Sequence, residues 1–210
     1  MLWVVLLSGL FTFLFLEMEA LVAVSGYGER MELVRSSGRS TSIEVIRDRV
    51  LAAVAGGELP LIVVDYLQKV AAPGAVDEQQ RVTEVVEGLK DLALEVGVPV
   101  LAVVAADKEG LVAGKRLRVH NLRGSSALAY EADVVLLLND KYDVVARHHL
   151  VYDTGNAERF RDYAVLTIEK NRSGLDKIDL EFRKRFDQGR FERTGKPVTE
   201  TLIDERVHLD

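Results

Sequence analysis

Two acidic residues follow long apolar runs, which is where carboxylates can do chemistry in an α/β protein. Asp65 ends the run LIVVD, and Glu17 ends the run FTFLFLE. A carboxylate at the end of a buried strand must be solvated, paired or linked to a metal, because burying a bare charge is unfavourable. Asp65 is therefore a candidate to hold a hydrated Mg²⁺ beside nucleotide phosphates, and Glu17 to orient or deprotonate an attacking water. Ordinary strand-end carboxylates that meet water are the alternative for both residues.

A basic segment between residues 106 and 123 is the candidate nucleic-acid contact. It is punctuated by glycine and holds five basic residues against Asp107 and Glu109, which leaves a local charge of +3. A mobile loop of this charge can follow a nucleic-acid backbone through salt-sensitive phosphate contacts. A solvated surface loop is the alternative, and the segment has no aromatic residue for base stacking. The five candidates are Lys108, Lys115, Arg116, Arg118 and Arg123.

Two further basic clusters lie nearer the C-terminus. Lys170 and Arg172 are two positions apart at the end of a predicted strand, so both side chains can point to the same side. A solvated charged turn is the simpler explanation for this pair when it is considered alone. Residues 182–193 interleave five basic residues with three phenylalanines, as a nucleic-acid platform does, although alternation across a hairpin explains the phenylalanines as core.

Strand-like and helix-like runs alternate along the chain and would position these residues. Thr41 and Glu44 form a capping-box pair before one helix, and Asp77 can cap a longer helix that Gly97 ends. Strands are predicted at LPLIVVDYL, VPVLAVVA, ADVVLLL and YAVLTIE, and a hairpin follows them. This order predicts an α/β fold with a mainly parallel, twisted sheet flanked by helices, and with closing antiparallel strands.

The composition limits the class of protein. The chain has 210 residues, of which 48% are hydrophobic and 29% charged, so it can bury a core and is not disordered throughout. Its formal charge of −6 excludes a protein that is basic throughout, so any nucleic-acid contact must be local. The absence of cysteine excludes disulfides, thiolate zinc sites and a cysteine nucleophile, and it is compatible with a reducing cytoplasm.

Residues 1–16 are apolar and carry no charged side chain, which leaves two interpretations. A secretory or anchor segment is one, although the run is shorter than the roughly 20 residues that span a bilayer and no basic residue precedes it. The other is a buried strand at residues 11–16 behind a short apolar lead at residues 1–10. Continuous apolar runs of this kind are typical of parallel sheets that helices cover on both faces.

Four segments, in this order, resemble the C-terminal motor domain of DnaB-type replicative helicases. They are LIVVDYLQKV, DEQQRVTEVVEGLKDLALEVGVPVLAVV, NLRGSSALAYEADVVLLLND and LTIEKNRSG. The resemblance implies a RecA-like motor domain over residues 11–193 and leaves a polar, acidic tail at 194–210 that we expect to be loosely attached. It also implies ATP and Mg²⁺ as cofactors, a cytoplasmic homo-oligomeric ring without a membrane anchor, and single-stranded DNA that passes the basic segment in the central channel.

The resemblance assigns roles to individual residues. Asp65 matches the Walker B aspartate, which holds Mg²⁺ through water, and Gln68 in the same DYLQ motif is grouped with the cofactor-binding residues. Glu17, in the LEM triplet, matches the glutamate that polarises the attacking water. Lys170 and Arg172, in EKNRSG, match a basic pair that a neighbouring subunit projects onto the γ-phosphate, where it stabilises charge that grows in the transition state.

The chain departs from this family at three points. No G-x-x-x-x-G-K-[ST] phosphate loop precedes Glu17, and neither Gly-Lys pair elsewhere is followed by the serine or threonine that would ligate Mg²⁺. Ala105 stands where the family usually carries a glutamine after a strand, and LRGS at residues 122–125 replaces the usual LRES. The phosphate cradle of backbone N–H groups is therefore missing from these residues.

Four functions remain as hypotheses. The first is the motor domain of an ATP-dependent DNA helicase, incomplete for ATP hydrolysis as written, either as a fragment of a longer ATPase or as an inactive relative, so its status as an enzyme stays open. The second is an inactive RecA-fold subunit that binds single-stranded nucleic acid or a ring partner. The others are a recombination-type ATPase of the RadA group and a membrane-anchored protein that uses residues 1–16.

Overall fold

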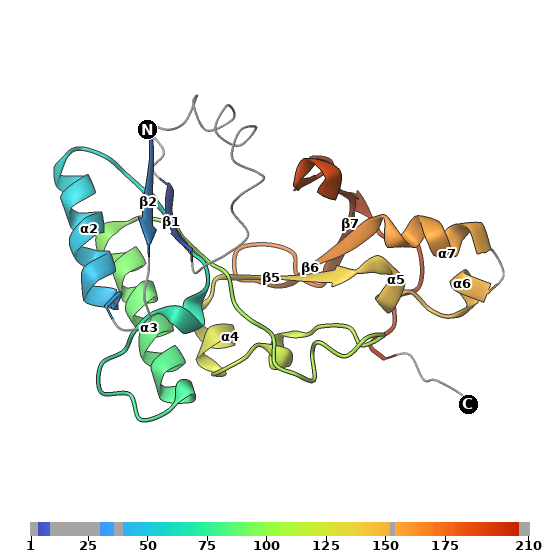
Figure 1. The fold of residues 1–210 in the computed structure, drawn as a ribbon, viewed down its shortest axis with the longest axis horizontal. Helices are drawn as coiled ribbons and strands as arrows, with labels where there is room; N and C mark the ends of the chain where they lie inside the picture. The colour runs from blue at the N-terminus through green and yellow to red at the C-terminus, as the bar shows by residue number, and fades with distance from the viewer. Residues whose placement is uncertain (1–3, 9–29, 36–39, 152–153, 206–210) are drawn as a thin grey trace. The chain divides into compact units, whose positions relative to one another are not determined.

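A computed structural model describes residues 4–8, 30–35, 40–151 and 154–205 (Figure 1). The chain forms two compact units. The first unit comprises Met1–Ala105 and Arg123–Glu131, and the second unit comprises Ala106–Leu122 and Ala132–Asp210. The chain therefore leaves the first unit after Ala105, returns at Arg123 and leaves again after Glu131. The domain boundaries given above, at residues 11 and 193, stay a prediction.

The first unit contains a four-stranded parallel sheet in the order β2-β1-β3-β4. Its strands are β1 (Val4–Ser8), β2 (Met31–Arg35), β3 (Leu61–Val64) and β4 (Val100–Ala102). The parallel sheet confirms the predicted α/β fold. β1 lies within the residues predicted to be an apolar lead, whereas the strand predicted at residues 11–16 lies outside the described residues. Both segments are apolar and uncharged, so composition alone does not distinguish which of them enters the sheet.

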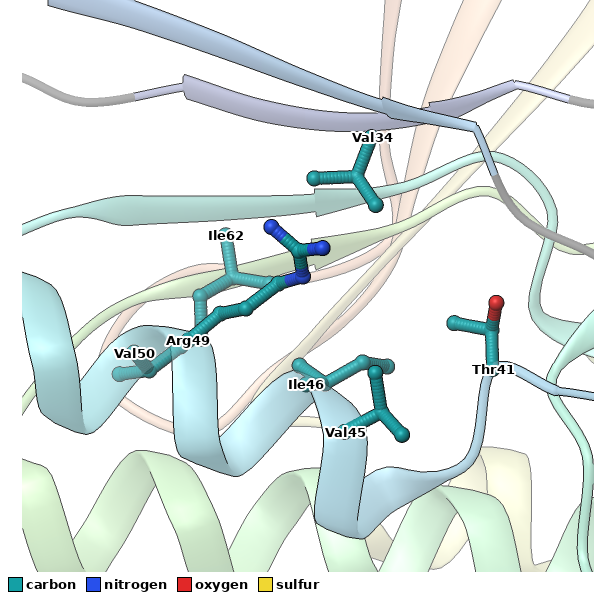
Figure 2. Close-up of a pocket in the computed structure, with 7 residues that line it drawn as sticks. All are labelled: Val34, Thr41, Val45, Ile46, Arg49, Val50 and Ile62. Carbon is teal, nitrogen blue, oxygen red and sulfur yellow. The ribbon is translucent and has the colours of Figure 1, made fainter.

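Helix α2 (Ile43–Ala55) packs against this sheet through its buried residues Ile46 and Val50. Figure 2 shows the crevice that these two side chains line together with Val34 of β2 and Ile62 of β3. The crevice has a volume of about 10 Å³, which is room for about one water molecule, so it is a packing gap and not a ligand site.

The start of α2 corrects one prediction. Ser42, and not Thr41, is the N-cap residue, with an extended backbone at φ −99° and ψ 176°. The Ser42 hydroxyl donates a hydrogen bond to Glu44, and this bond lowers the pKa of the Glu44 carboxyl. The sequence signal therefore located the helix start to within one residue, which is the usual precision of such signals.

Helix α3 (Glu78–Val96) begins and ends as predicted. Asp77 accepts a hydrogen bond from the Gln80 amide at 2.7 Å, and Gly97 closes the helix in the left-handed region at φ 73°. Its buried residues recur at the predicted steps of three and four; they are Val82, Val85, Val86, Leu89 and Leu92. None of the helices in the described part of the chain is long and apolar enough to cross a membrane.

The short helix α4 (Ala127–Glu131) packs against α3 where the chain has returned to the first unit. Gly124, just before it, has φ 117°, and a Cβ atom there would lie 2.6 Å from Cγ2 of Val82. The hydroxyls of Ser125 and Thr83 share a hydrogen bond of 2.7 Å. The chain therefore re-enters through a position that only glycine fits without displacing α3.

The second unit is built on an antiparallel sheet. It contains β5 (Val134–Asp140), β6 (Tyr163–Asn171), β7 (Ile178–Arg185) and β8 (Arg190–Phe191) in sequential order, with β9 (Lys196–Pro197) paired to β7. These strands confirm the predicted antiparallel closure. Between β5 and β6, the chain forms three short helices, α5 (Lys141–Val144), α6 (His148–Val151) and α7 (Thr154–Arg161). The buried ring of Phe160 anchors α7, and a single apolar anchor gives too little periodicity to detect.

The C-terminal tail is packed over its described residues, 194–205, which corrects the expectation of a loosely attached segment there. β9 pairs with β7, the amide of Ile203 donates to the carbonyl of Val144 at 2.8 Å, and Leu202 forms a β-bridge with Val145. Ion pairs also hold the tail to the rest of the second unit. Lys141 is only 2% exposed, and its Nζ atom donates to Glu181 and, at 2.7 Å, to Glu200 of the tail.

We expect Lys141→Ala to lower the free energy of unfolding by about 3 kcal/mol, because it leaves two half-buried carboxylates without their cation. Urea denaturation followed by circular dichroism measures the loss. The exposed Lys108→Ala is the matched control and should change stability by less than about 0.5 kcal/mol. Equal effects of the two variants would contradict a buried ion triad.

The same triad predicts an acid-dependent loss of stability. Burial alone would raise the pKa of Glu200, but the hydrogen bond and charge of Lys141 outweigh burial and hold it below the ordinary value of 4.5. A carboxyl with a lowered pKa stabilises the fold above its unfolded-state pKa, and this contribution is lost as the pH falls through the folded-state pKa. Glu200→Gln should therefore flatten the decline of stability below about pH 4.5, whereas the exposed Glu109→Gln should not.

Candidate functional site

Asp65 lies immediately after β3, at the carboxyl edge of the parallel sheet. Ligands of open α/β sheets bind at this edge, where the strands end and the loops begin. Asp65 is half-buried, and its carboxylate has no hydrogen-bond or ion-pair partner among the described residues. A partly buried carboxylate of this kind is stabilised by water or by a cation. This is the environment that the predicted magnesium ligand requires.

Glu17 lies outside the described residues, so its predicted position beside Asp65 is not tested here. The strand next to β3 is β1, and Leu7 of β1 is aligned with Val64 of β3. β1 ends at Ser8, nine residues before Glu17. Among the described residues, β1 is thus a strand that ends beside Asp65, and the placement and role of Glu17 stay predictions.

Gln68 sits in the short 3₁₀ helix η2 (Leu67–Lys69) that follows Asp65, and its side chain is 6% exposed. Its Nε2 atom donates to the carbonyl of Arg123 at 2.8 Å, and its Oε1 atom accepts from the amide of Ala105 at 3.2 Å. Both ends of the carboxamide are therefore engaged by the backbone. The predicted cofactor-binding role of Gln68 stays a prediction, and the structure gives its carboxamide two backbone partners within the first unit.

Arg116 is not available for the nucleic-acid contact that its sequence position predicts. The side chain is 6% exposed, and its Nη2 atom donates to Asp179 of β7 and, at 3.0 Å, to Oγ1 of Thr167 of β6. The backbone amide of Arg116 also donates to the carbonyl of Asp204 at 2.7 Å. The guanidinium thus forms an internal ion pair that ties the basic segment to the antiparallel sheet, and the segment here is not the expected mobile loop.

Arg118 is also paired but remains partly exposed. Its Nε and Nη2 atoms donate to Oδ1 of Asp204 at 2.8 and 2.5 Å, and its Nη1 atom donates to Oε2 of Glu169 at 3.1 Å. Burial lowers the pKa of Arg118, but the two carboxylates more than offset burial, so the pKa lies above its ordinary value. Arg118 therefore keeps its charge, and that charge is shared with a residue of the C-terminal tail.

The remaining basic residues of the segment differ in their surroundings. Arg123 belongs to the first unit, where its Nη2 atom lies 2.9 Å from Oε2 of Glu78 at the start of α3. Lys115 is half-buried and its backbone forms a bridge with Glu205. Lys108 is exposed in a turn. The segment thus presents positive charge at Lys108, Lys115 and part of Arg118, which is less than a count along the sequence suggests.

Lys170 and Arg172 lie at the end of β6 and in the turn that follows it. The amide and the Nη1 atom of Arg172 donate to the backbone and side chain of Asp133, at 2.9 and 3.0 Å. Both residues of this pair are exposed enough, at 46% for Arg172 and 59% for Asp133, for the pair to exchange with a ligand. Lys170 is aligned with Val135 across the sheet, next to a β-bulge. The expected common direction of the two basic side chains stays a prediction.

Sequence reasoning missed the carboxylates that neutralise the basic segment. They come from β6, β7, the start of α3 and the tail, up to 86 residues away, and they are Glu78, Glu169, Asp179 and Asp204. A usable signal was the acidic excess of the whole chain, since 33 acidic residues face 27 basic ones. A local charge sum cannot show which of these acids the fold brings close.

The amino-acid sequence of this chain is similar to those of relatives with curated descriptions. The replicative DNA helicase DnaB of Pasteurella multocida is 33% identical over 133 residues, which is 62% of this chain and 26% of the relative. DnaB of Rickettsia bellii is 27% identical over 146 residues, or 63% of this chain and 29% of the relative. The chain therefore spans less than a third of the length of these relatives.

Solved structures and a family profile agree with these matches. A structure described as a DnaB-like replicative helicase and its interactions with primase superposes with a TM-score of 0.68 at 18% identity, covering 90% of this chain and 51% of that one. A second solved structure, described as an ATPase domain, gives a TM-score of 0.63 at 20% identity, covering 84% of this chain and 61% of that one. These two likenesses establish that the chain has a RecA-like fold. The profile of the DnaB-like helicase C terminal domain matches residues 15–192, and the chain therefore belongs to that family.

Proposed function

We propose that this chain provides the Walker B edge, the basic segment and the trans-acting basic pair of a DnaB-type DNA helicase. In such a machine, a cytoplasmic ring of identical subunits would use ATP to move along single-stranded DNA during replication. The observation that carries the proposal is Asp65, an unpaired and half-buried carboxylate among the described residues, at the carboxyl edge of a parallel sheet. The family match over residues 15–192 supports it.

The residues around Asp65 fit a hydrated magnesium ion better than a protein-only metal site. The described residues contain no group of three or more His, Asp or Glu side chains that could hold a metal by themselves. Mg²⁺ keeps most of its waters and is usually bound by one or two carboxylates together with substrate phosphates. When bound with Mg²⁺, ATP would supply the phosphoanhydride bond, and Asp65 would fix the position of the cation's water shell.

Lys170 and Arg172 are proposed to act on a nucleotide held by a neighbouring subunit. Arg172 lies in an exposed turn, so it can reach outward after exchanging Asp133 for a more highly charged partner. A guanidinium that contacts a transferring phosphoryl group stabilises charge that develops in the transition state. The ion pair with Asp133 would hold Arg172 in place until a phosphate competes for it.

The alternative function is an inactive RecA-fold subunit that binds single-stranded nucleic acid or a ring partner. Two sequence features favour it. The 210 residues hold no G-x-x-x-x-G-K-[ST] motif, and Ala105 lacks the side-chain carboxamide of the glutamine that the family usually carries there. Without the cradle of backbone N–H groups, the β- and γ-phosphates lose most of their ligands. The two functions share the DNA contact and differ in nucleotide turnover.

We expect calorimetry to show no micromolar affinity of this chain for ATP, and a residual Kd of about 1 mM that requires Mg²⁺. Asp65→Asn should abolish the magnesium dependence, whereas the exposed Asp48→Asn should leave it unchanged. Micromolar magnesium-dependent binding would contradict the missing-cradle argument. A residual affinity that is indifferent to Asp65→Asn would overturn the assignment of the nucleotide edge.

We also expect weak binding to single-stranded DNA that falls steeply with salt, measured by the fluorescence anisotropy of a labelled oligo(dT). Arg118→Ala should weaken binding and reduce the salt slope by about one. Asp204→Asn should tighten binding several-fold, because it removes a carboxylate that competes with phosphate for Arg118. Asp187→Asn, an exposed acid in the β7–β8 turn, is the control. Binding that is insensitive to salt and to both variants would exclude this surface.

A further inference from the structure

The carboxamide of Gln68 makes two hydrogen bonds to backbone groups that lie far apart in the sequence. It donates to the carbonyl of Arg123 and accepts from the amide of Ala105, at 2.8 and 3.2 Å. The side chain is almost fully buried, so water is a poor substitute for either partner. Gln68 therefore holds the backbone at Ala105 and the backbone at Arg123 close to each other.

These two stretches are the ends of the basic segment. The chain leaves the first unit after Ala105 and returns to it at Arg123. The amide of Arg123 donates to the carbonyl of Ala105 at 2.9 Å, so the two ends also bond to each other. We call this arrangement of Ala105, Arg123 and the Gln68 carboxamide the segment root. All of its atoms belong to the first unit.

The segment root connects to Asp65 through a continuous series of hydrogen bonds. The amide of Val103 donates to the carbonyl of Val64, and the amide of Leu67 donates to the carbonyl of Val103, both at 2.9 Å. Asp65 lies between Val64 and Leu67, and Gln68 follows directly. A shift of the β3 end would therefore move the root, because these two hydrogen bonds and the short η2 helix join them.

We propose that Gln68 is a positioning residue that clamps the root of the basic segment to the strand end carrying Asp65. The proposal rests on the proposed function where it concerns DNA, since the segment is there the DNA contact. It is distinct from the cofactor-binding role that the sequence predicted for Gln68. The clamp fixes the two points at which the basic segment leaves and re-enters the first unit.

Glutamine suits this position because the root needs one donor and one acceptor from the same short side chain. Leucine fills a similar volume and offers neither. Glutamate accepts from the Ala105 amide, but an ionised carboxylate places a second oxygen against the Arg123 carbonyl. Once protonated, the glutamic acid regains a donor. Gln68→Glu should therefore keep the bond to Ala105 at any pH, lose the bond to Arg123 at neutral pH and regain it in acid, whereas Gln68→Leu loses both bonds.

Amide hydrogen exchange measured by NMR tests the clamp without any activity. In Gln68→Leu, the protection factor of the Ala105 amide should fall roughly tenfold, as expected for the loss of one buried hydrogen bond, while that of Val85 in α3 stays constant. In Gln68→Glu, the Ala105 amide keeps an acceptor, so its protection factor should stay near that of the wild type at both pH 7 and pH 5. Gln79→Leu and Gln79→Glu, at an exposed position of α3, are the matched controls.

Binding of labelled oligo(dT) tests the positioning role. Gln68→Leu should weaken binding about threefold or more, and Gln68→Glu should show part of this loss at pH 7 with recovery at pH 5, after normalisation to the wild type. Unchanged exchange at Ala105 in Gln68→Leu would overturn the clamp. Lost protection with unaltered DNA affinity would overturn the positioning role. A wild-type chain that binds no DNA would instead overturn the proposed function, and the clamp would be decided by exchange alone.

Discussion

Ion pairs between residues far apart in sequence determine what the basic segment can do. Asp179 covers Arg116, and Asp204 and Glu169 share Arg118, so the segment lies against the antiparallel sheet. A buried pair adds little net stability, but breaking one leaves an uncompensated charge, and this asymmetry makes the arrangement hard to rearrange. The exposed positive charge that remains is small and placed by the fold. Electrostatic contact with a polyanion is therefore a competition with carboxylates already in position.

The elements that can be predicted from the sequence are those determined by residues close to one another along the chain. Asp77 and Gly97 bound α3 because a carboxylate caps free amides and glycine accepts a left-handed backbone, and both effects act within one turn. Strands β3, β5 and β6 follow from continuous or alternating apolar runs. The position of β1 did not follow, since residues 1–16 offer several equivalent apolar windows. The packing of the tail depends on Lys141, whose two carboxylate partners lie 40 and 59 residues away.

The candidate site shows the same division. Asp65 was found because an acid after an apolar run occupies a strand end in any parallel sheet. Gln68 was singled out by its motif, but its partners at Ala105 and Arg123 are backbone atoms, which carry no sequence signature. Arg116 was taken for a ligand because sequence reveals its charge and not its burial. Motifs thus identify which residues matter, whereas the fold decides which atoms of them are occupied.

The bond between Ala105 and Arg123 gives the basic segment the geometry of an insert with touching ends. When a loop leaves and returns at neighbouring points, the entropic cost of closing it during folding grows only slowly with its length. The first unit would accept a longer, shorter or grafted stretch between these points without losing its own core. Among related proteins, this is the place where variation in length and sequence would be tolerated best, with the glycine at position 124 as the fixed downstream border.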